Sequence, residues 1–224
     1  MNYEEYVRYH RQGDAGVEER MIASLCRHFK LSSWDSFRLI YYYTMTYHIP
    51  SALEMLAGEI DMKKLKFRTD RRYVRCNGAY DRLLKELSRD MHDSLLCVST
   101  TQEAYDIVKK WYFFGRYASF LFLEVYINVF RPKWTDNIKL AWEKDENYTK
   151  GAILVARSNE KSQLDIFLNR AREDCRDNAF SIETSLCAVE KIKKGTRWNG
   201  YYTERMLADA RGSKYESLIY KLAK

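Results

Sequence analysis

The segment FFGRYASFLFLEVYINVF, residues 113–130, is the most apolar part of this 224-residue chain and restricts its fold most strongly. Its length approaches that of a membrane span, but it contains Arg116 and Glu124, whose charges are costly in lipid. We therefore expect a core helix rather than a membrane helix, and no membrane partner. The polar opening of the chain has no secretory signal, so a cytoplasmic location is the default expectation.

Helix-forming residues dominate the rest of the sequence. There are only two prolines and nine glycines, and no alternation of apolar and polar residues is long enough to require a sheet. Ser32 or Ser33 can cap a helix that ends at His48. Thr100 and Glu103 form a capping box before another helical segment. Further helices are expected at residues 51–58, 78–93, 116–130, 161–178, 181–195, 199–212 and 214–224. We predict an all-α protein, a compact multi-helix domain around the apolar helix.

Positive charge is concentrated in KKLKFRTDRRYVR, residues 63–75. Seven basic residues stand there against one acid, Asp70, so seven minus one gives +6 of the formal net charge of +7. We expect this segment to be a basic arm or loop on a single domain spanning residues 1–224. Such a patch attracts polyanions, nucleic acid first, although a solvated basic loop without a partner is the alternative. The expected nucleic-acid-binding residues are Lys63, Lys64, Lys66, Arg68, Arg71, Arg72 and Arg75.

Several familiar kinds of site are absent from the sequence. Five scattered cysteines without a C-x-x-C pair indicate reduced thiols, and the four histidines form no metal-binding motif, so we expect no metal site. The chain has no phosphate-binding G-x-x-x-x-G-K-[ST] loop and no G-x-S-x-G nucleophile elbow.

Arg116 and Glu124 stand eight residues apart, which on a helix places them about 80° apart and roughly 12 Å along the axis. They cannot pair with each other, so each needs its own counter-charge or a polar cavity. One interpretation is two structural ion pairs that fix the central helix. The other is a site in which Arg116 holds an anion and Glu124 acts as a base or binds an ammonium group.

A second polar group follows in RWNGYYTERMLADAR, residues 197–211. Asn199 and Gly200 form a polar turn at the start of a helix, whose free N–H groups favour an anion. Tyr201 and Arg205 lie one turn apart, so a tyrosine can stack on a base while an arginine holds phosphate. The alternative is an ordinary surface helix whose two tyrosines pack inward.

These two motifs, FFGRYASFLFLEVY and NGYYTERMLADA, in a basic helical chain of this size, resemble the amino acid:DNA transferases. That family belongs to the bacteriophage thymine-hypermodification enzymes and is related to the putrescinyl- and glutamyl-thymine pyrophosphorylases. The resemblance implies a fold related to helical DNA glycosylases. It also implies an enzyme that displaces pyrophosphate from activated 5-hydroxymethyluracil in DNA with the amine of an amino acid such as glycine.

The partners that the resemblance implies are double-stranded DNA with a modified thymine, an amino acid donor and an upstream DNA-base kinase. No cofactor is certain, and Mg²⁺ is a candidate because pyrophosphate chemistry often involves it. The residues that carry the resemblance are Gly115, Arg116, Tyr117 and Glu124 in the first motif, and Gly200, Tyr201, Tyr202 and Arg205 in the second.

The reaction that this family carries out gives these residues roles. An arginine would stabilise the leaving pyrophosphate, and a carboxylate, Glu124 or Glu204, would accept a proton from the amine. An aromatic ring would hold the extruded base. The expected catalytic residues are Glu124, Arg116 and Glu204, and the expected substrate-binding residues are Tyr117, Tyr201, Tyr202, Arg205 and Asn199.

Two alternatives to the transferase remain at this stage. In the first, the chain is a non-catalytic helical nucleic-acid-binding adaptor, in which residues 63–75 bind the nucleic acid and Arg116 and Glu124 are core pairs. In the second, it is an enzyme that acts on a free nucleotide, and its activity would not depend on polymer length.

Overall fold

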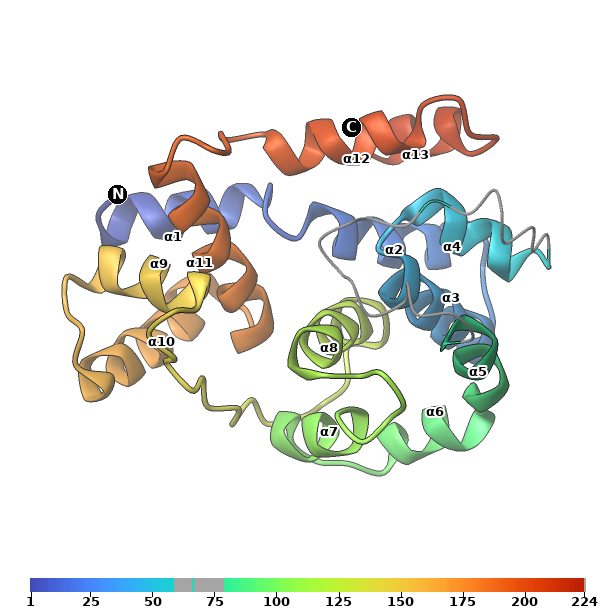
Figure 1. The fold of residues 1–224 in the computed structure, drawn as a ribbon, viewed down its shortest axis with the longest axis horizontal. Helices are drawn as coiled ribbons and strands as arrows, with labels where there is room; N and C mark the ends of the chain where they lie inside the picture. The colour runs from blue at the N-terminus through green and yellow to red at the C-terminus, as the bar shows by residue number, and fades with distance from the viewer. Residues whose placement is uncertain (59–65, 67–78, 224) are drawn as a thin grey trace. The chain divides into compact units, whose positions relative to one another are not determined.

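A computed structural model describes residues 1–58, 66 and 79–223, and within these ranges the regular elements are helices (Figure 1). One isolated bridge joins Thr100 to Thr135 in addition. The predicted all-α class is confirmed. The contacts along the chain divide it into unit 1, Met1–Val17 with Asp136–Arg205, and unit 2, Glu18–Thr135 with Met206–Lys224. Each unit is described by itself, and the single domain over 1–224 stays a prediction.

Unit 1 is built from four helices and the beginning of a fifth. They are α1 (Tyr3–Gln12), α9 (Asn147–Ala156), α10 (Lys161–Cys175), α11 (Ala179–Lys193) and the first half of α12 (Tyr201–Ala210), which continues into unit 2. The helix α9 packs most extensively on α11. A Cβ atom added to Gly151 of α9 would lie 2.1 Å from the backbone oxygen of Leu186, so the two backbones touch there. Only glycine permits this approach.

A polar clamp holds the irregular chain before α9 against the helices of unit 1. The Asp136 carboxylate accepts hydrogen bonds from the Arg172 guanidinium at 2.9 and 3.3 Å, and from the Ala179 N–H at 2.9 Å. The same guanidinium donates to the carbonyl oxygen of Ile138 at 2.5 Å. The clamp therefore ties α10, the start of α11 and the 136–138 segment together with charge-assisted bonds.

Unit 2 contains the apolar segment from which the prediction of a core helix started. Its helices are α2 (Val17–His28), α3 (Ser33–Thr46), α4 (Ile49–Leu56), α5 (Ala79–Glu86), α6 (Arg89–Leu96), α7 (Thr101–Val108), α8 (Arg116–Phe130) and α13 (Glu216–Leu222). The apolar helix is α8, which packs on α3 and α7. Phe122 of α8 is fully buried, and its ring centroid lies 5.6 Å from that of Phe37 and 5.1 Å from that of Trp111. Aromatic packing around α8 thus forms the core of unit 2.

Several helix boundaries follow local signals in the sequence. The side chain of Ser32 caps α3 by accepting from the Asp35 N–H, and the predicted Thr100–Glu103 capping box precedes α7. Gly115 is the N-cap of α8 and separates that helix from α7. The helices α3 and α7 therefore begin where a side chain satisfies a backbone N–H of the first turn.

Three boundary predictions are wrong. The helix expected over 78–93 is two helices, because the chain leaves the helical conformation at Leu87 and Ser88 becomes the N-cap of α6. The helix expected over 51–58 begins at Ile49, because His48 caps it. The Nδ1 atom of His48 accepts from the Ser51 N–H at 3.2 Å. The helix expected from Ser181 begins at Ala179, because Asn178 caps it. The helices α1, α2 and α9 were not predicted.

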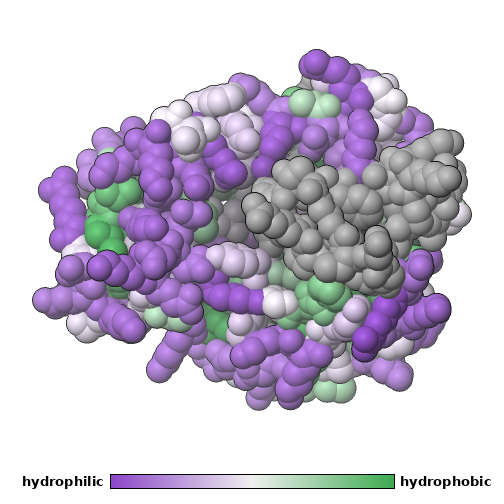
Figure 2. All heavy atoms as spheres, in the orientation of Figure 1, coloured by the Kyte–Doolittle hydropathy of each residue, from purple (hydrophilic) through white to green (hydrophobic). Residues whose placement is uncertain are grey.

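Within the described ranges, no helix has both the length and the apolar character needed to cross a membrane. The face shown in Figure 2 is largely hydrophilic, and its apolar residues lie in small separate patches.

Candidate functional site

Arg116 occupies the first position of α8 and is only partly buried. The expectation that it lies inside a buried run is therefore wrong, because the helix begins at this residue. Its guanidinium carbon lies 5.2 Å from the ring centroid of Tyr117 and 4.7 Å from that of Phe120. Two aromatic faces thus orient the charge, with the Tyr117 side chain half exposed at 50%.

A surface hollow of about 480 Å³ surrounds this arginine. We call it the α7–α8 hollow, and it is lined by Lys109, Trp111, Phe113, Phe114, Gly115, Arg116, Tyr117 and Ala118. Phe113 has a φ of 62°, in the left-handed region that non-glycine residues seldom adopt. Two cations beside four aromatic rings make a surface suited to an anionic aromatic ligand. Of these residues, only Arg116 and Tyr117 were predicted as site residues.

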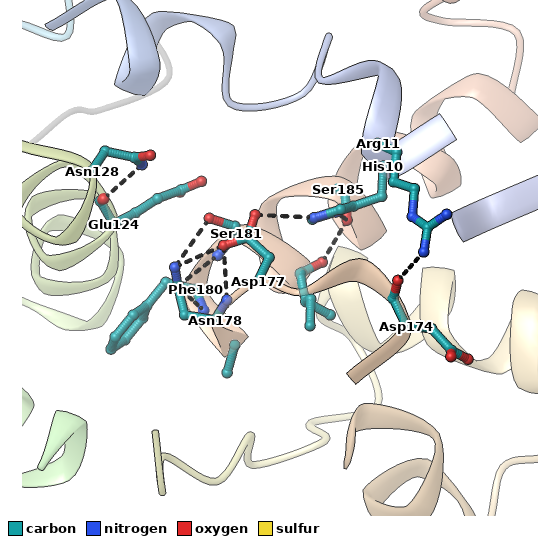
Figure 3. A network of polar contacts seen from close by, with 12 residues as sticks. His10, Arg11, Glu124, Asn128, Asp174, Asp177, Asn178, Phe180, Ser181 and Ser185 are labelled. Atoms are coloured by element: carbon teal, nitrogen blue, oxygen red, sulfur yellow. Dashed lines mark hydrogen bonds and ion pairs between the residues drawn. The ribbon is translucent and has the colours of Figure 1, made fainter. Parts of the chain in front are cut away.

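Glu124 lies in the middle of α8 and is 3% exposed, as expected for a charge within the apolar run. Its backbone oxygen accepts a hydrogen bond from the Asn128 side chain at 2.9 Å (Figure 3). The side chains of Leu123 and Val125 beside it in the sequence are fully buried. A general base must touch the amine that it deprotonates, and this burial limits the access of a solute to Glu124.

The second predicted group gathers around the start of α12 in unit 1. Tyr202 is 7% exposed, and its hydroxyl accepts a hydrogen bond from the Arg197 guanidinium. The guanidinium carbon of Arg197 lies 5.0 and 4.9 Å from the ring centroids of Tyr201 and Tyr202. That of Arg205 lies 5.6 and 5.1 Å from the same two rings. We call these four residues and Trp198 the 197–205 cluster.

The exposed part of the 197–205 cluster is aromatic. Trp198 is 51% exposed, and its ring packs edge-on against Tyr201 at 5.0 Å. Asn199 is exposed, and its Nδ2 donates to Gln12 Oε1 at 3.1 Å. Glu204 is also exposed, so its carboxylate meets solvent. An open tryptophan beside two stacked arginines can hold a base on one face and phosphate on the other.

The N-terminus of α12 was expected to hold an anion, but a carboxylate of the chain itself occupies it. Asp14 is 6% exposed and accepts from the Tyr202 N–H at 3.4 Å and the Thr203 N–H at 3.0 Å. The Thr203 hydroxyl donates to the same carboxylate at 2.9 Å. The expected anion position at these N–H groups is therefore wrong, because Asp14 already satisfies them.

The predicted site residues are divided between the two units. Arg116, Tyr117 and Glu124 belong to unit 2, and Asn199, Tyr201, Tyr202, Glu204 and Arg205 belong to unit 1. The residues of each motif lie together within one unit, so the α7–α8 hollow of unit 2 and the 197–205 cluster of unit 1 are each described by themselves.

Of the predicted basic segment, only Lys66 lies within the described residues. Lys66 is exposed, and its N–H donates to the Ser51 hydroxyl at 2.9 Å. The other predicted nucleic-acid-binding residues, Lys63, Lys64, Arg68, Arg71, Arg72 and Arg75, lie outside the described residues, as does most of the predicted arm at 63–75.

A network that the sequence did not indicate joins α1 to α11 (Figure 3). His10 Nε2 donates to the Asp177 carboxylate at 3.1 Å, and His10 Nδ1 lies 2.9 Å from the Ser185 hydroxyl. The Tyr6 hydroxyl lies 2.9 Å from the same oxygen. This order of side chains is that of a serine-nucleophile triad. However, Ser185 is 1% exposed, so a substrate carbonyl cannot reach it, and the network holds α1 against α11 instead.

No group of side chains within the described ranges could hold a metal ion through three or more His, Cys, Asp or Glu residues. No protein-family model matches this sequence, and no curated protein matches it significantly. The site must therefore be interpreted from its own residues.

Sequence reasoning missed Lys109, Trp111 and Phe113 in the α7–α8 hollow, and Arg197 and Trp198 in the 197–205 cluster. The sequence did contain a signal for Arg197 and Trp198, because these two residues directly precede the predicted Asn199–Gly200 turn. Residues 109–113 gave no comparable signal, since their grouping depends on how the chain turns between α7 and α8.

Proposed function

We propose that this protein modifies bases in DNA, as a transferase that displaces pyrophosphate from activated 5-hydroxymethyluracil with the amine of an amino acid such as glycine. The reaction comes from the family resemblance of the two motifs, which also supplies the proposed partners and the DNA-glycosylase-like fold. The partners are double-stranded DNA with a modified thymine, an amino acid donor and an upstream DNA-base kinase. The proposed setting is a bacteriophage-infected cell, with the enzyme in the host cytoplasm.

The observation that carries the proposal is the 197–205 cluster. Two guanidinium groups lie over the rings of Tyr201 and Tyr202 within 5.6 Å, beside a half-exposed Trp198. Aromatic stacking stabilises an unstacked base by about 1–3 kcal/mol, and arginine pairs well with phosphate oxygens. A surface with both features suits an extruded base that carries a pyrophosphate group.

The proposed reaction is a substitution at the 5-methylene carbon of the base. The amine nitrogen forms a bond to this carbon while the bond from carbon to the pyrophosphate oxygen breaks, and pyrophosphate leaves with the electron pair. An arginine then stabilises the charge that accumulates on the leaving group. The ammonium form of the donor loses a proton to a carboxylate before attack.

Of the two proposed bases, Glu204 has the better access. It is exposed on α12 and shares that helix with Tyr201 and Arg205, whereas Glu124 is 3% exposed. We therefore assign the proton-accepting role to Glu204 and keep Glu124 as the second candidate. In unit 2, Arg116 in the α7–α8 hollow is the proposed group for an anion.

One observation favours a non-catalytic nucleic-acid-binding adaptor as the second candidate function. Asp14 caps α12 from inside the protein, and Tyr202 is almost fully buried, so part of the second motif serves folding. In an adaptor, the exposed aromatic and basic residues would bind the nucleic acid without chemistry.

Lysine substitutions at two stacked arginines separate these functions. We expect Arg116→Lys and Arg205→Lys to keep DNA affinity within about twofold, since each keeps its charge, but to lower product formation at least about tenfold, because lysine lacks the planar fork. Arg170→Lys is the matched control, since Arg170 also stacks on a tyrosine, Tyr3, at 4.2 Å but lies outside both candidate sites.

Product formation would be measured by nucleoside mass spectrometry and affinity by fluorescence anisotropy with the same DNA. If the wild-type protein binds DNA without forming product, and the double change Arg71→Ala, Arg72→Ala abolishes that binding, the adaptor replaces the transferase.

A further inference from the structure

A serine and a histidine of unit 2 meet at the start of α3. Ser33 is the first residue of α3, and its hydroxyl oxygen lies 2.7 Å from Nε2 of His92 on α6. Ser33 is exposed, whereas His92 is only 5% exposed. A hydroxyl within hydrogen-bond reach of an imidazole is the arrangement that activates a serine nucleophile. We call these two residues the Ser33–His92 pair.

The exposure of its serine separates this pair from the buried network in unit 1. In that network the Ser185 hydroxyl lies 2.9 Å from Nδ1 of His10, but Ser185 is 1% exposed. At the Ser33–His92 pair the serine is open to solvent, and the histidine lies behind it in the core. An electrophile in solution can therefore reach Ser33 but not Ser185.

Aromatic rings hold the imidazole of His92 in place. Its ring centroid lies 4.9 Å from that of Phe37, 5.1 Å from that of Phe130 and 6.3 Å from that of Tyr126. Among the residues that the structure describes, Nδ1 of His92 has no hydrogen-bond partner, and Ser33 is the polar partner of the ring. Packing therefore directs Nε2 at Ser33, in place of the carboxylate that orients the base of a serine triad.

Burial keeps His92 in the neutral form, which can accept a proton. Desolvation lowers the pKa of its imidazole, although the Asp93 carboxylate opposes the shift. The reaction uses the tautomer with its proton on Nδ1, because Nε2 must take the proton of the Ser33 hydroxyl. A base with a lowered pKa is weak, so it suits an ester whose leaving group departs without being protonated. Activated esters are therefore the substrate class that matches this pair.

Two backbone N–H groups at the serine can stabilise the negative charge of the tetrahedral intermediate. Ser33 and Trp34 are the first two residues of α3, whose N–H groups have no partner within the helix. In the described part of the chain, the Ser32 hydroxyl accepts from the Asp35 N–H and leaves those of Ser33 and Trp34 available. The N–H groups of a nucleophilic serine and of the residue after it are donors that serine hydrolases use for this charge.

We propose that Ser33 is a nucleophile that takes an acyl group from an activated ester, with His92 as its base. The Ser33 oxygen forms a bond to the carbonyl carbon while the hydroxyl proton passes to Nε2 of His92. The bond from that carbon to the leaving-group oxygen then breaks, and the leaving group departs with the electron pair. This inference goes beyond the proposed base modification and does not rest on it, because the two reactions share no residue.

The test incubates the full-length protein with p-nitrophenyl acetate, and separately with a fluorophosphonate, from which Ser33 would displace fluoride. We expect a rapid first release of about one nitrophenolate per protein molecule, because the acyl group stays on the serine. Peptide mass spectrometry should find the acetyl and phosphonyl groups on Ser33 and not on the buried Ser185. No label on Ser33, or the same rate of labelling at the exposed Ser99, would overturn the proposal.

Two variants assign the roles of nucleophile and base. Ser33→Ala should abolish the rapid release. His92→Phe keeps an aromatic ring in the core but removes the base, and should slow the labelling of Ser33 about one-hundredfold or more. Ser99→Ala is the matched control, since Ser99 is an exposed serine just before α7 whose hydroxyl has no histidine partner in the described ranges. Ser99→Ala should react as the wild type does.

Circular dichroism shows whether each variant keeps its helices. Labelling of Ser33 at the wild-type rate in a folded His92→Phe protein would contradict the base, and rapid release by Ser33→Ala would contradict the nucleophile. If His92→Phe does not fold, the wild-type protein alone decides, because Ser33 should be labelled at least about one-hundredfold faster than Ser99. Ser33→Ala should modify DNA as the wild type does, so the failure of either proposal leaves the other standing.

Discussion

Arginine side chains lie over tyrosine rings at both candidate sites. Arg116 stacks beside Tyr117, and Arg197 and Arg205 share the rings of Tyr201 and Tyr202. A guanidinium held over a ring keeps its charge in place at a small entropic cost, and its edge still donates hydrogen bonds. This arrangement explains why both motifs pair an arginine with tyrosines.

Residue-level prediction from sequence succeeded where the partner is near in the chain. Tyr201, Tyr202 and Arg205 were predicted to lie together, and Arg205 lies over both rings, whereas Arg197 and Trp198 of the same cluster were missed. Asp14, which caps α12, lies more than 180 positions before that helix. Nothing in the sequence indicates such a contact, so the expected anion at α12 was wrong.

His92 provides a pH-dependent test of packing in unit 2. Its Nε2 lies 2.7 Å from the Ser33 hydroxyl, and its ring lies 4.9 Å from that of Phe37 and 5.1 Å from that of Phe130. Desolvation in this aromatic site lowers the pKa of His92, although Asp93 opposes the shift. The neutral form is therefore favoured in the folded protein.

The stability that this histidine contributes should be present above the unfolded pKa of about 6.5 and be lost as the pH falls through the lower folded pKa. We expect His92→Phe to lose less free energy of unfolding than the wild type between pH 7.5 and pH 5, whereas the exposed His28→Gln should follow the wild type. Urea unfolding at several pH values measures this. Identical pH dependence in His92→Phe would contradict the account.

At the scale of elements, the contact between α9 and α11 depends on one glycine. The Cβ of an alanine at Gly151 would lie 2.1 Å from the oxygen and 2.8 Å from the carbonyl carbon of Leu186. Both are backbone atoms, so the helices would have to move apart. We expect Gly151→Ala to lower the free energy of unfolding by about 1–3 kcal/mol or more.

Gly115→Ala is the control for that change. A Cβ at Gly115 would meet nothing within 4 Å. Gly115→Ala should therefore lower the free energy of unfolding by less than about 1 kcal/mol, the scale of an N-cap change. Guanidinium unfolding of both variants gives the comparison. A Gly151→Ala protein as stable as Gly115→Ala would mean that α9 and α11 do not approach as closely as described.

Elements were predicted well where a capping side chain and a helix-forming sequence agree, as for α3 and α7. Amphipathic periodicity alone failed over 78–93, because an apolar stripe continues through the break at Leu87 and Ser88. The helix α1 was missed because its sequence is mostly polar, and only Tyr6 and Tyr9 among its residues are buried.

At the scale of the whole molecule, the residues that the two motifs supply fall into different units. A sequence cannot show this division, because unit 1 joins the first seventeen residues to a segment that starts at Asp136. The formal net charge of +7 remains consistent with a polyanionic partner, and most of that charge belongs to residues 63–75.

The most direct test of the central claim is mass spectrometry of nucleosides from treated DNA. DNA containing 5-hydroxymethyluracil would be activated by a DNA-base kinase and incubated with this protein and a mixture of amino acids. We predict a new nucleoside whose mass equals thymidine plus one amino acid less two hydrogens, present only with both kinase and protein. The transferase would be contradicted if the digest contained hydroxymethyluracil or its pyrophosphate ester but no such product, under salt conditions in which the protein binds the DNA.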